Sequence, residues 1–396
     1  MIRHLITLMW NRRRANGLLL AEIFLAFVVL FIVGSVGLYN YRNYRAPLGF
    51  GYENVWQINL DAGTQPRPEQ YATLQTILRQ LRATPGVVGV ARTSSNTPFS
   101  FSTNNIYLET EQNGVKRTVE PVNIYYASPE LSGVMGLELR AGRWFDRRDE
   151  AATRPSVVIN EQLRDELFGP GGLAVGKRIG NKDREWQVVG VSGSYRAGGE
   201  LSEPQPGMFV HVSSEDTSRA ASRLLLAVKP GSGAELEKKL SADIRSAGPT
   251  WISNITTLPD QRQTQLKAGL VLPVLLGVVC LFLLINVGLG LFGVLWLNIS
   301  RRRGEIGVRR AMGATAGGIS GQVLGEILVI TTFGLALGLL VAVQFPLLGV
   351  QNVRPDIYFT AMLLAAGTLY LLATVCALYP SRLAAGIQPA VALREE

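Results

Sequence analysis

Few residues in this chain have the types and spacing that bond chemistry requires. Gly171–Lys177 has the GxxxxGK spacing of a phosphate-binding loop, but Arg178 follows where a serine or threonine would hold magnesium. His211 is the histidine of the central segment that could act as base in a Ser-His arrangement, and the sequence contains no GxSxG elbow. We therefore expect neither nucleotide hydrolysis by this route nor serine-type catalysis, and we interpret Gly171–Lys177 as a surface turn.

Pairs of acidic residues offer a second route to chemistry. Glu161 with Asp165, and Asp149 with Glu150, are examples of such pairs. In a charge-balanced segment they are typical of solvated helix or turn surfaces. A membrane-anchored glycosidase that uses a carboxylate pair is the alternative, and it would require activity from residues 46–262 alone.

Cysteine and histidine are too rare and too scattered for a metal site. Cys280 and Cys376 both lie inside apolar stretches, and His4 and His211 lie in separate regions. A disulfide framework or a zinc site needs these residues in clusters. We expect no catalytic residue, no metal and no cofactor.

The segment 300–315 has the pattern of a docking surface. Glu305 lies four residues from both Arg301 and Arg309, and such ion pairs support a short helix. Basic residues alone are enough to orient a loop at a membrane. They do not account for Glu305 or for the small residues that end the segment, Gly313 and Ala314. We predict a rigid amphipathic helix that meets a cytoplasmic partner, and a basic loop that only sets topology is the alternative. Its predicted residues are Arg301, Arg302, Arg303, Glu305, Ile306, Gly307, Arg309, Arg310, Ala311, Gly313 and Ala314.

Four apolar stretches must hold this segment in place. The chain has 396 residues, of which 17% are charged, whereas about 25% is usual for a soluble protein. The shortfall is concentrated in Leu18–Leu38, Ala268–Leu297, Ile319–Val343 and Ile357–Tyr379. Each is near or above the ~20 residues that cross a bilayer as a helix. The sequence predicts a membrane protein with four transmembrane helices.

The distribution of charge sets the expected orientation. Residues 46–262 carry 24 basic and 24 acidic residues, so the net charge of +9 comes from the rest of the chain. Basic residues gather before the first span, in the loop Asn298–Gly318 and after Pro380, and such residues mark the cytoplasmic side. We expect both termini in the cytoplasm, residues 46–262 outside, and no nucleic-acid partner. The first span is expected to be a retained anchor, and Met1–Trp10 an interfacial amphipathic helix.

The sequence pattern of the outer segment is typical of an α+β domain. Alternating apolar residues predict strands, and helical spacing predicts two helices, with the order strand–helix–strand at both ends of the segment. Two strand–helix–strand units, one on each side of a strand-rich insertion, predict two subdomains. The expected strands are Asn54–Leu60, Val87–Thr93, Ser156–Asn160, Trp186–Val191, Met208–Val212, Arg223–Val228 and Trp251–Thr257, and the helices are Arg67–Arg82 and Ala234–Ser246.

The second span is too long for a bilayer, and the third carries unusual residues. A helix from Ala268 to Ser300 would measure ~49 Å against a hydrocarbon core of ~30 Å. We expect it to project beyond the membrane, and a tilted helix preceded by a loop, with Pro273 at the break, is the alternative. Small residues favour close helix packing, and Glu326 is expected to face a neighbouring helix or a polar cavity near Gln322 or Asn286. The predicted packing residues are Gly317, Gly321, Gly325, Glu326, Gly334 and Gly338.

Three segments together resemble the FtsX/MacB-type ABC transporter permeases. RRRGEIGVRRAMGAT at 301–315 is similar to that family's signature between the second and third spans. The tail at 379–394 is similar to its closing motif, through Pro380, Arg382, Pro389, Leu393 and Arg394. Outside the membrane, Leu139–Phe145, Val157–Phe168, Val175–Ile179 and Trp186–Val191 resemble its periplasmic core domain.

The resemblance implies a domain plan and partners. It implies an anchor at 1–45, a periplasmic core domain at 46–262, and a permease domain at 263–396 with a coupling loop at 299–318 and a cytoplasmic tail at 380–396. Two such protomers, identical or related, would dimerise on an ABC ATPase dimer. The sequence contains no nucleotide-binding domain, so it resembles the members that take their ATPase from another polypeptide.

The same resemblance implies mechanical work without bond chemistry. ATP hydrolysis by the partner would move the outer domain of a protein in the bacterial inner membrane. Export or efflux of a periplasmic substrate, with a membrane-fusion protein and an outer-membrane channel as partners, is the favoured function. An FtsX-like signalling permease that controls a cell-wall hydrolase or a peptide-sensing pathway is the alternative.

Overall fold

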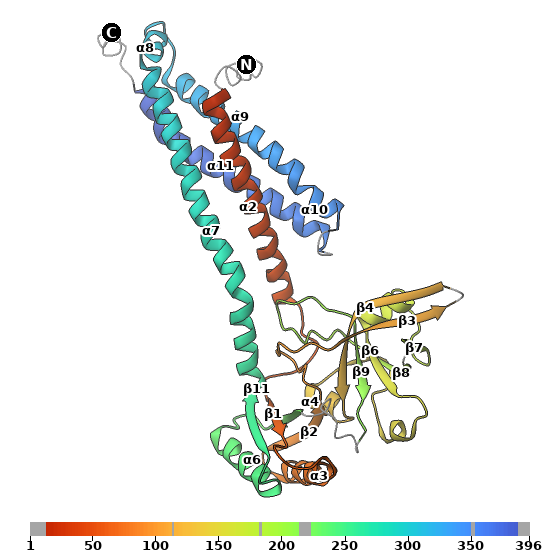
Figure 1. Cartoon of the computed structure of the whole chain (residues 1–396). Helices are drawn as coiled ribbons and strands as arrows, with labels where there is room; N and C mark the ends of the chain where they lie inside the picture. Colours follow the sequence, from red (N-terminus) through yellow and green to blue (C-terminus); the bar gives the residue numbers. More distant parts are fainter. Residues whose placement is uncertain (1–12, 113–114, 182–183, 214–222, 350–352, 387–396) are drawn as a thin grey trace. The chain divides into compact units, whose positions relative to one another are not determined.

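The computed structural model describes residues 13–112, 115–181, 184–213, 223–349 and 353–386. They form two compact units, which divide between Arg42 and Asn43 and again between Gly269 and Leu270. The central stretch is a β-rich unit, and the residues on either side form a helical unit (Figure 1). Met1–Trp10 and the tail residues Pro389, Leu393 and Arg394 lie outside the described residues.

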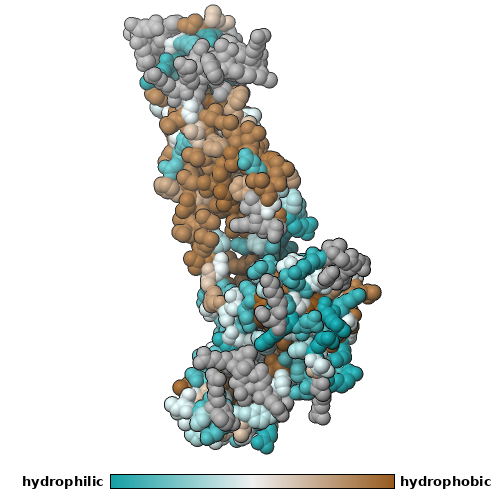
Figure 2. Space-filling model, turned by 45° about the vertical axis from the view of Figure 1, so that its right-hand side comes forward, coloured by the Kyte–Doolittle hydropathy of each residue, from teal (hydrophilic) through white to brown (hydrophobic). Residues whose placement is uncertain are grey.

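The helical unit contains the four predicted spans. The helices long and apolar enough to cross a membrane cover 17–45, 258–301, 316–347 and 355–385, by length and composition. Apolar side chains form its surface in Figure 2, where the β-rich unit is mostly hydrophilic. Its elements are α2 (Arg13–Arg45), α7 (Leu258–Arg301), α8 (Arg303–Ala311), α9 (Ala316–Ala342), α10 (Gln344–Leu347) and α11 (Pro355–Ala385).

One apolar core joins α2, α7, α9, α10 and α11. Phe31 of α2 is buried in it and packs edge-on against Phe345 of α10, with ring centroids 5.3 Å apart. Thr332 of α9 and Tyr370 of α11 share a hydrogen bond of 2.9 Å between their hydroxyls. At the end of α2, Arg42 pairs with Asp356 of α11 at 2.7 Å. The helical unit is thus held by apolar packing along its length and by polar contacts at single points.

Helix α7 is continuous over 44 residues. At 1.5 Å per residue it is about 66 Å long, more than twice the ~30 Å of a hydrocarbon core. Pro273 lies inside it without ending it, so the alternative of a loop before the span is wrong. Its first residues belong to the β-rich unit and its last to the helical unit.

One sheet path links eleven strands in the described part of the β-rich unit. Their order is β11-β1-β10-β2-β4-β3-β7-β8-β6-β9, with β5 on β8 and a further pairing of β4 with β9. The strands are β1 (Val55–Asp61), β2 (Val87–Thr93), β3 (Asn105–Gln112), β4 (Val115–Ala127), β5 (Leu139–Gly142), β6 (Ser156–Asn160), β7 (Arg178–Gly180), β8 (Glu185–Ser192), β9 (Gly207–His211), β10 (Arg223–Val228) and β11 (Ile252–Thr257).

This path contains the two predicted subdomains. Strands β11, β1, β10 and β2 form an open antiparallel sheet, and α3 (Arg67–Ala83) and α6 (Ala234–Ala247) bury their apolar faces against it. Strands β4, β3, β7, β8, β6 and β9 close into a ring, because β9 pairs back onto β4. A single residue pair, Thr93 with Ala127, joins the two sheets.

The predicted strands and helices of this unit are present within one or two residues of their expected ends. Helix α5 (Glu161–Phe168) starts where Asn160 accepts a hydrogen bond from the Leu163 amide at 3.0 Å, which is a normal N-cap. The hairpin of β3 and β4 was not predicted. Four successive residues of β4, Val122 to Tyr125, are all buried, so apolar and polar residues do not alternate there.

Candidate functional site

Helix α8 is the element that the 301–315 pattern predicts, and its ends have clear local causes. Arg302 separates it from α7, with backbone angles outside the helical range. At the other end Gly313 adopts a φ of +97°, which favours glycine. Its amide donates to the Arg310 carbonyl at 3.1 Å, and the Ala314 amide donates to the Arg309 carbonyl at 3.0 Å. These two bonds are a Schellman motif, which stops the helix at a defined residue.

An apolar contact fastens α8 to the helices beside it. Ile306 is buried with Ile299 of α7, Ile319 of α9 and Ala384 of α11. Gly307 is buried as well. Ile306 and Gly307 therefore do not lie on the presented surface, because burying Ile306 is the main apolar gain that this short helix can make.

A chain of polar side chains runs from α8 to α9. Arg309 donates to Glu305 at 2.5 Å and to Gln322 of α9 at 3.0 Å. Gln322 donates to Glu326 at 3.3 Å, and Arg302 donates to both oxygens of Glu326 at 3.1 and 3.3 Å. The five residues connect α8 to α9 at two positions one turn apart.

Glu326 lies among polar side chains, as expected for a carboxylate in an apolar helix. Its side chain is 25% exposed and that of Arg302 is 18% exposed, so this pair is largely shielded from solvent. A carboxylate within a membrane-spanning helix is costly unless it is paired. Of the two expected neighbours, Gln322 is in contact, whereas Asn286 bonds to the Phe282 carbonyl of its own helix.

The outward face of α8 is basic with an apolar edge. Arg303, Val308 and Ala311 of α8 are exposed, and so is Arg301 at the end of α7. Met312 is 77% exposed at the tip. These exposed basic and apolar side chains form the surface that α8 presents to a partner.

The predicted packing glycines fall into two groups. A Cβ at Gly334 would lie 2.8 Å from Ile23 of α2, and one at Gly338 would overlap Phe27. At Gly317, Gly321 and Gly325 a Cβ would meet nothing within 4 Å. Among these glycines, close helix approach within the described chain therefore occurs at Gly334 and Gly338 only. Of the tail residues, Pro380 is buried inside α11 and Arg382 is exposed.

The β-rich unit contains a site that sequence reasoning missed. Arg196 is 1% exposed, and its guanidinium donates to the backbone carbonyls of Asn43, Ala46, Glu200 and Ser202 at 2.7 to 3.0 Å. The Glu200 carboxylate pairs with Arg262 of α7. We call residues 196–202 the clasp, because this loop binds both the end of α2 with the residue that follows it and the first part of α7. No sequence motif marks it.

Both halves of this architecture match known families. Residues 19–245 match the MacB-like periplasmic core domain, which is more than half of the chain, and residues 277–389 match the FtsX-like permease C-terminal domain. The chain belongs to the MacB/FtsX-type permease family. The match follows the order that the structure has, with one helix, the β-rich domain and three further helices.

Individual relatives of this permease are larger proteins. It is 31% identical over 276 residues to the "Macrolide export ATP-binding/permease protein MacB 1/2" of Paracoccus denitrificans, covering 67% of this chain and 40% of that one. It is 22% identical to the "Pyoverdine export ATP-binding/permease protein PvdT" of Pseudomonas putida, covering 98% and 58%. The chain thus spans about half the length of the curated relatives it matches.

Among solved structures, the periplasmic region of MacB from Actinobacillus actinomycetemcomitans is similar to part of this chain. The identity is 17% and the TM-score 0.38, over 55% of this chain and 94% of that one. With the periplasmic core domain between the first and second apolar helices, the β-rich unit of this MacB/FtsX-type permease lies outside the membrane.

The candidates for bond chemistry have structural roles in this permease. Amides of Gly172, Gly176 and Lys177 donate to backbone carbonyls, so this loop does not present a row of free amides for phosphate. His211 packs edge-on against Phe145. Across the described residues, no group of three or more metal-ligating side chains occurs.

The acidic pairs are also occupied within the protein. Asp149 accepts two hydrogen bonds from Arg143, at 2.6 and 2.8 Å, and one from Ser156 at 2.5 Å. Burial raises the pKa of Asp149, but these bonds outweigh it and lower that pKa to about 2. Asp165 pairs with Arg164 at 2.7 Å. A carboxylate held ionised by a fixed arginine is unsuited to act as a general acid.

Proposed function

We propose that this chain is the permease part of an ABC transporter and passes motion from an ATPase to its outer domain. The observation that carries this proposal is α8 itself, a short helix with a basic and apolar outer face. It is joined to α9 by the chain Glu305–Arg309–Gln322–Glu326–Arg302, which resists sliding of one helix against the other. A helix fastened this way moves its neighbours when a partner pushes it.

The path of the motion follows from the elements that meet at α8. Arg302 alone separates α8 from α7, and α7 continues to Leu258 in the β-rich unit. We propose that closure of an ATP-bound ATPase dimer shifts α8, and that α7 carries the shift outward. At the far end Arg262 of α7 meets Glu200 of the clasp, so the outer domain receives the motion there. No bond chemistry is assigned to this chain.

We place both termini and α8 in the cytoplasm of a bacterial inner membrane, with a second permease protomer beside this one. The names of the relatives pair ATP binding with a permease in one protein. We propose that here the ATPase is a partner subunit. Those names also specify export, which supports export of a periplasmic substrate over a signalling role. Co-purification of a membrane-fusion protein would support this choice, and co-purification of a cell-wall hydrolase or a histidine kinase would contradict it.

The decisive experiment separates ATP hydrolysis from transport. Glu305→Ala with Arg309→Ala removes the start of the polar chain from exposed positions. We expect the complex to assemble and hydrolyse ATP while transport falls about tenfold or more, because α8 no longer moves with α9. Arg154→Ala with Glu185→Ala, an exposed pair on the outer domain, is the matched control. Unchanged transport per ATP in the α8 variant would overturn the proposal.

A further inference from the structure

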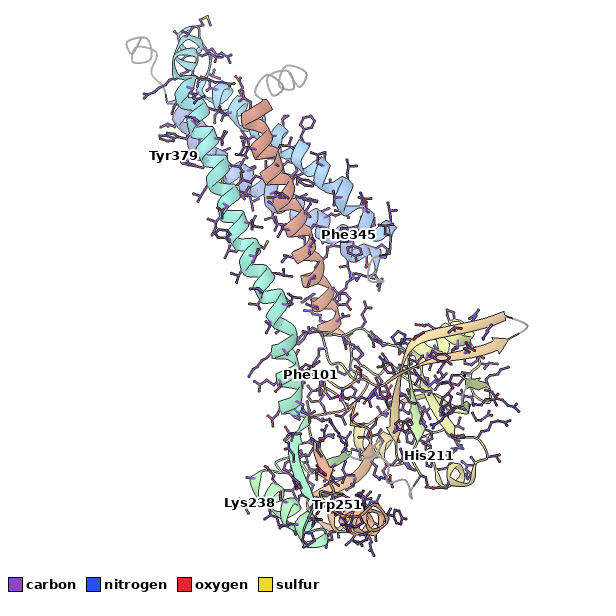
Figure 3. The ribbon with its side chains drawn as sticks, viewed as in Figure 1. Phe101, His211, Lys238, Trp251, Phe345 and Tyr379 are labelled. Atoms are coloured by element: carbon purple, nitrogen blue, oxygen red, sulfur yellow. The ribbon has the colours of Figure 1, made fainter. Side chains whose placement is uncertain are left out.

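Helices α7 and α11 carry three exposed aromatic rings that the coupling mechanism does not use. Phe292 and Trp296 lie one turn apart on α7, and their rings stack with centroids 6.2 Å apart. Tyr379 of α11, labelled in Figure 3, is within 5° of parallel to Trp296, and the two ring centroids are 6.5 Å apart. The centroid of the Tyr379 ring is also 6.1 Å from that of Phe292. We call these three residues the aromatic stack.

The aromatic stack is open to its surroundings. Its residues are 37% to 59% exposed. Among the hydrogen bonds between described residues, none involves the indole NH of Trp296 or the hydroxyl of Tyr379. An indole NH can only donate, and a phenol can donate as well as accept. The stack therefore offers two hydrogen-bond donors to an acceptor outside the helical unit.

The aromatic stack lies between an apolar and a basic stretch of surface. On the side away from α8, Leu289 and Ile285 continue the exposed face of α7, at 66% and 54% exposure. On the side toward α8, Arg382 follows Tyr379 by three residues on α11 and is exposed. This order of apolar, aromatic and basic groups matches the order of acyl chains, ester groups and phosphate in a phospholipid. Tryptophan and tyrosine are enriched at that level of a bilayer.

The charges around the aromatic stack favour an anion. Residues 270–301 and 357–385 of the two helices contain no acidic residue. Glu305 and Glu326 already pair with arginines. Glu22 of α2 packs against α7 on a side about 120° around the helix axis from Trp296. Arg382 has no ion pair among the described residues, so its guanidinium is available for a charge-assisted bond to a phosphate.

We infer that the aromatic stack and Arg382 bind one anionic phospholipid, in the leaflet on the α8 side of the membrane. The phosphate pairs with Arg382, and the ester carbonyls accept hydrogen bonds from Trp296 and Tyr379. An acyl chain lies on the exposed apolar face of α7. A second copy of the chain packed here about a twofold axis would set this surface against itself, which would leave both copies of Arg382 without an acid.

Quenching of Trp296 fluorescence by brominated lipids tests this site on the full chain in nanodiscs. Bromine on an acyl chain quenches a tryptophan that touches the lipid. Trp10→Phe removes the tryptophan before the first span, and the remaining ones lie in the β-rich unit outside the membrane, where their emission is a constant background. The measurement uses neither ATP nor an ATPase, so its failure leaves the coupling proposal intact.

The probes are brominated phosphatidylglycerol diluted into unbrominated phosphatidylcholine, and the reverse mixture. We expect phosphatidylglycerol to contact Trp296 about fivefold more than its share of the bilayer, which is the preference that one arginine gives near a membrane surface. Trp296→Phe should abolish the quenching, which assigns it to this residue.

Three variants separate a binding site from a generally basic surface. Arg382→Gln should return phosphatidylglycerol to about its bulk share. Tyr379→Phe keeps the ring and should lower the preference about twofold, since one hydrogen bond is lost. Arg301→Gln removes the same charge from the end of α7, on another side of that helix, and should leave the preference unchanged. A thermal melt of each variant checks folding.

Three results would overturn the proposal. Absence of quenching by either lipid would mean that protein, such as a second protomer, covers the aromatic stack. Equal occupancy by the two lipids would mean ordinary contact with the bilayer. An equal loss of preference in Arg301→Gln and Arg382→Gln would mean a diffuse attraction to the basic end of the helices.

Discussion

At the scale of single residues, the clearest feature that the sequence did not predict is Arg196, a buried arginine that donates to several backbone carbonyls. Arg196 is balanced by backbone carbonyl dipoles, and each of its nitrogens finds an acceptor. Five donors in a rigid fork let one arginine satisfy several carbonyls at once, which a lysine cannot do. The same residue therefore organises the chain after α2 and the loop that bears Glu200.

Arg196→Met should destabilise the outer domain by about 3 kcal/mol, because several carbonyls lose their donor while the volume stays filled. Thermal unfolding of the full chain, followed by a probe in the outer domain, measures it. Arg79→Met on an exposed helix surface should stay within about 0.5 kcal/mol. Equal unfolding temperatures for the two variants would contradict the role assigned to the clasp.

At the scale of elements, the glycines of α9 divide by what lies beside them. Gly334 and Gly338 let α2 approach because a side chain there would meet Ile23 or Phe27. Gly321 lies on the same helix in open space. The spacing of four is the same in both groups, so spacing by itself does not say which glycines are packed.

Gly338→Ala should destabilise the helical unit by about 1–3 kcal/mol, since Phe27 is fully buried and cannot move aside. Gly321→Ala should be neutral or stabilise by up to about 1 kcal/mol, because alanine is the better helix former. Melting temperatures of both variants in detergent measure the difference. A larger loss at Gly321 would mean that another molecule packs there.

At the scale of the whole chain, one span decides which parts share a side of the membrane. In the topology that we propose, the chain crosses the membrane once between the outer domain and α8, through α7. Leu173, which is 88% exposed, and Met312, which is 77% exposed, therefore belong to opposite sides.

Single cysteines at these two positions should react with a membrane-impermeant thiol reagent from opposite sides. Leu173→Cys should label in intact cells, and Met312→Cys only in inside-out vesicles. The background carries Cys280→Ser and Cys376→Ser, which removes both native thiols. Labelling of Met312→Cys from outside would contradict the orientation and, with it, the proposed contact with an ATPase.

Much of the fold was readable from local pattern. Strands β2, β6 and β10 have the expected ends, because short runs rich in apolar residues between turn signals favour buried strands. Helix α8 could be predicted from its charged pairs and from Gly313 at its end. The burial of Ile306 and the bonding of Glu326 to Arg302 could not, since both depend on which helices come together.

The sequence by itself determined the four apolar helices, the neutral outer segment, the family and the basic α8 segment, because each rests on composition or on contacts a few residues apart. Tertiary structure alone decided the ring closure of β9 on β4, the clasp around Arg196 and the aromatic stack of α7 and α11. Those features join residues that are far apart in the chain, such as Arg196 with Ala46 and Asn123 with Gly207. No local pattern encodes such a contact, since its free energy arises only when the whole domain has packed.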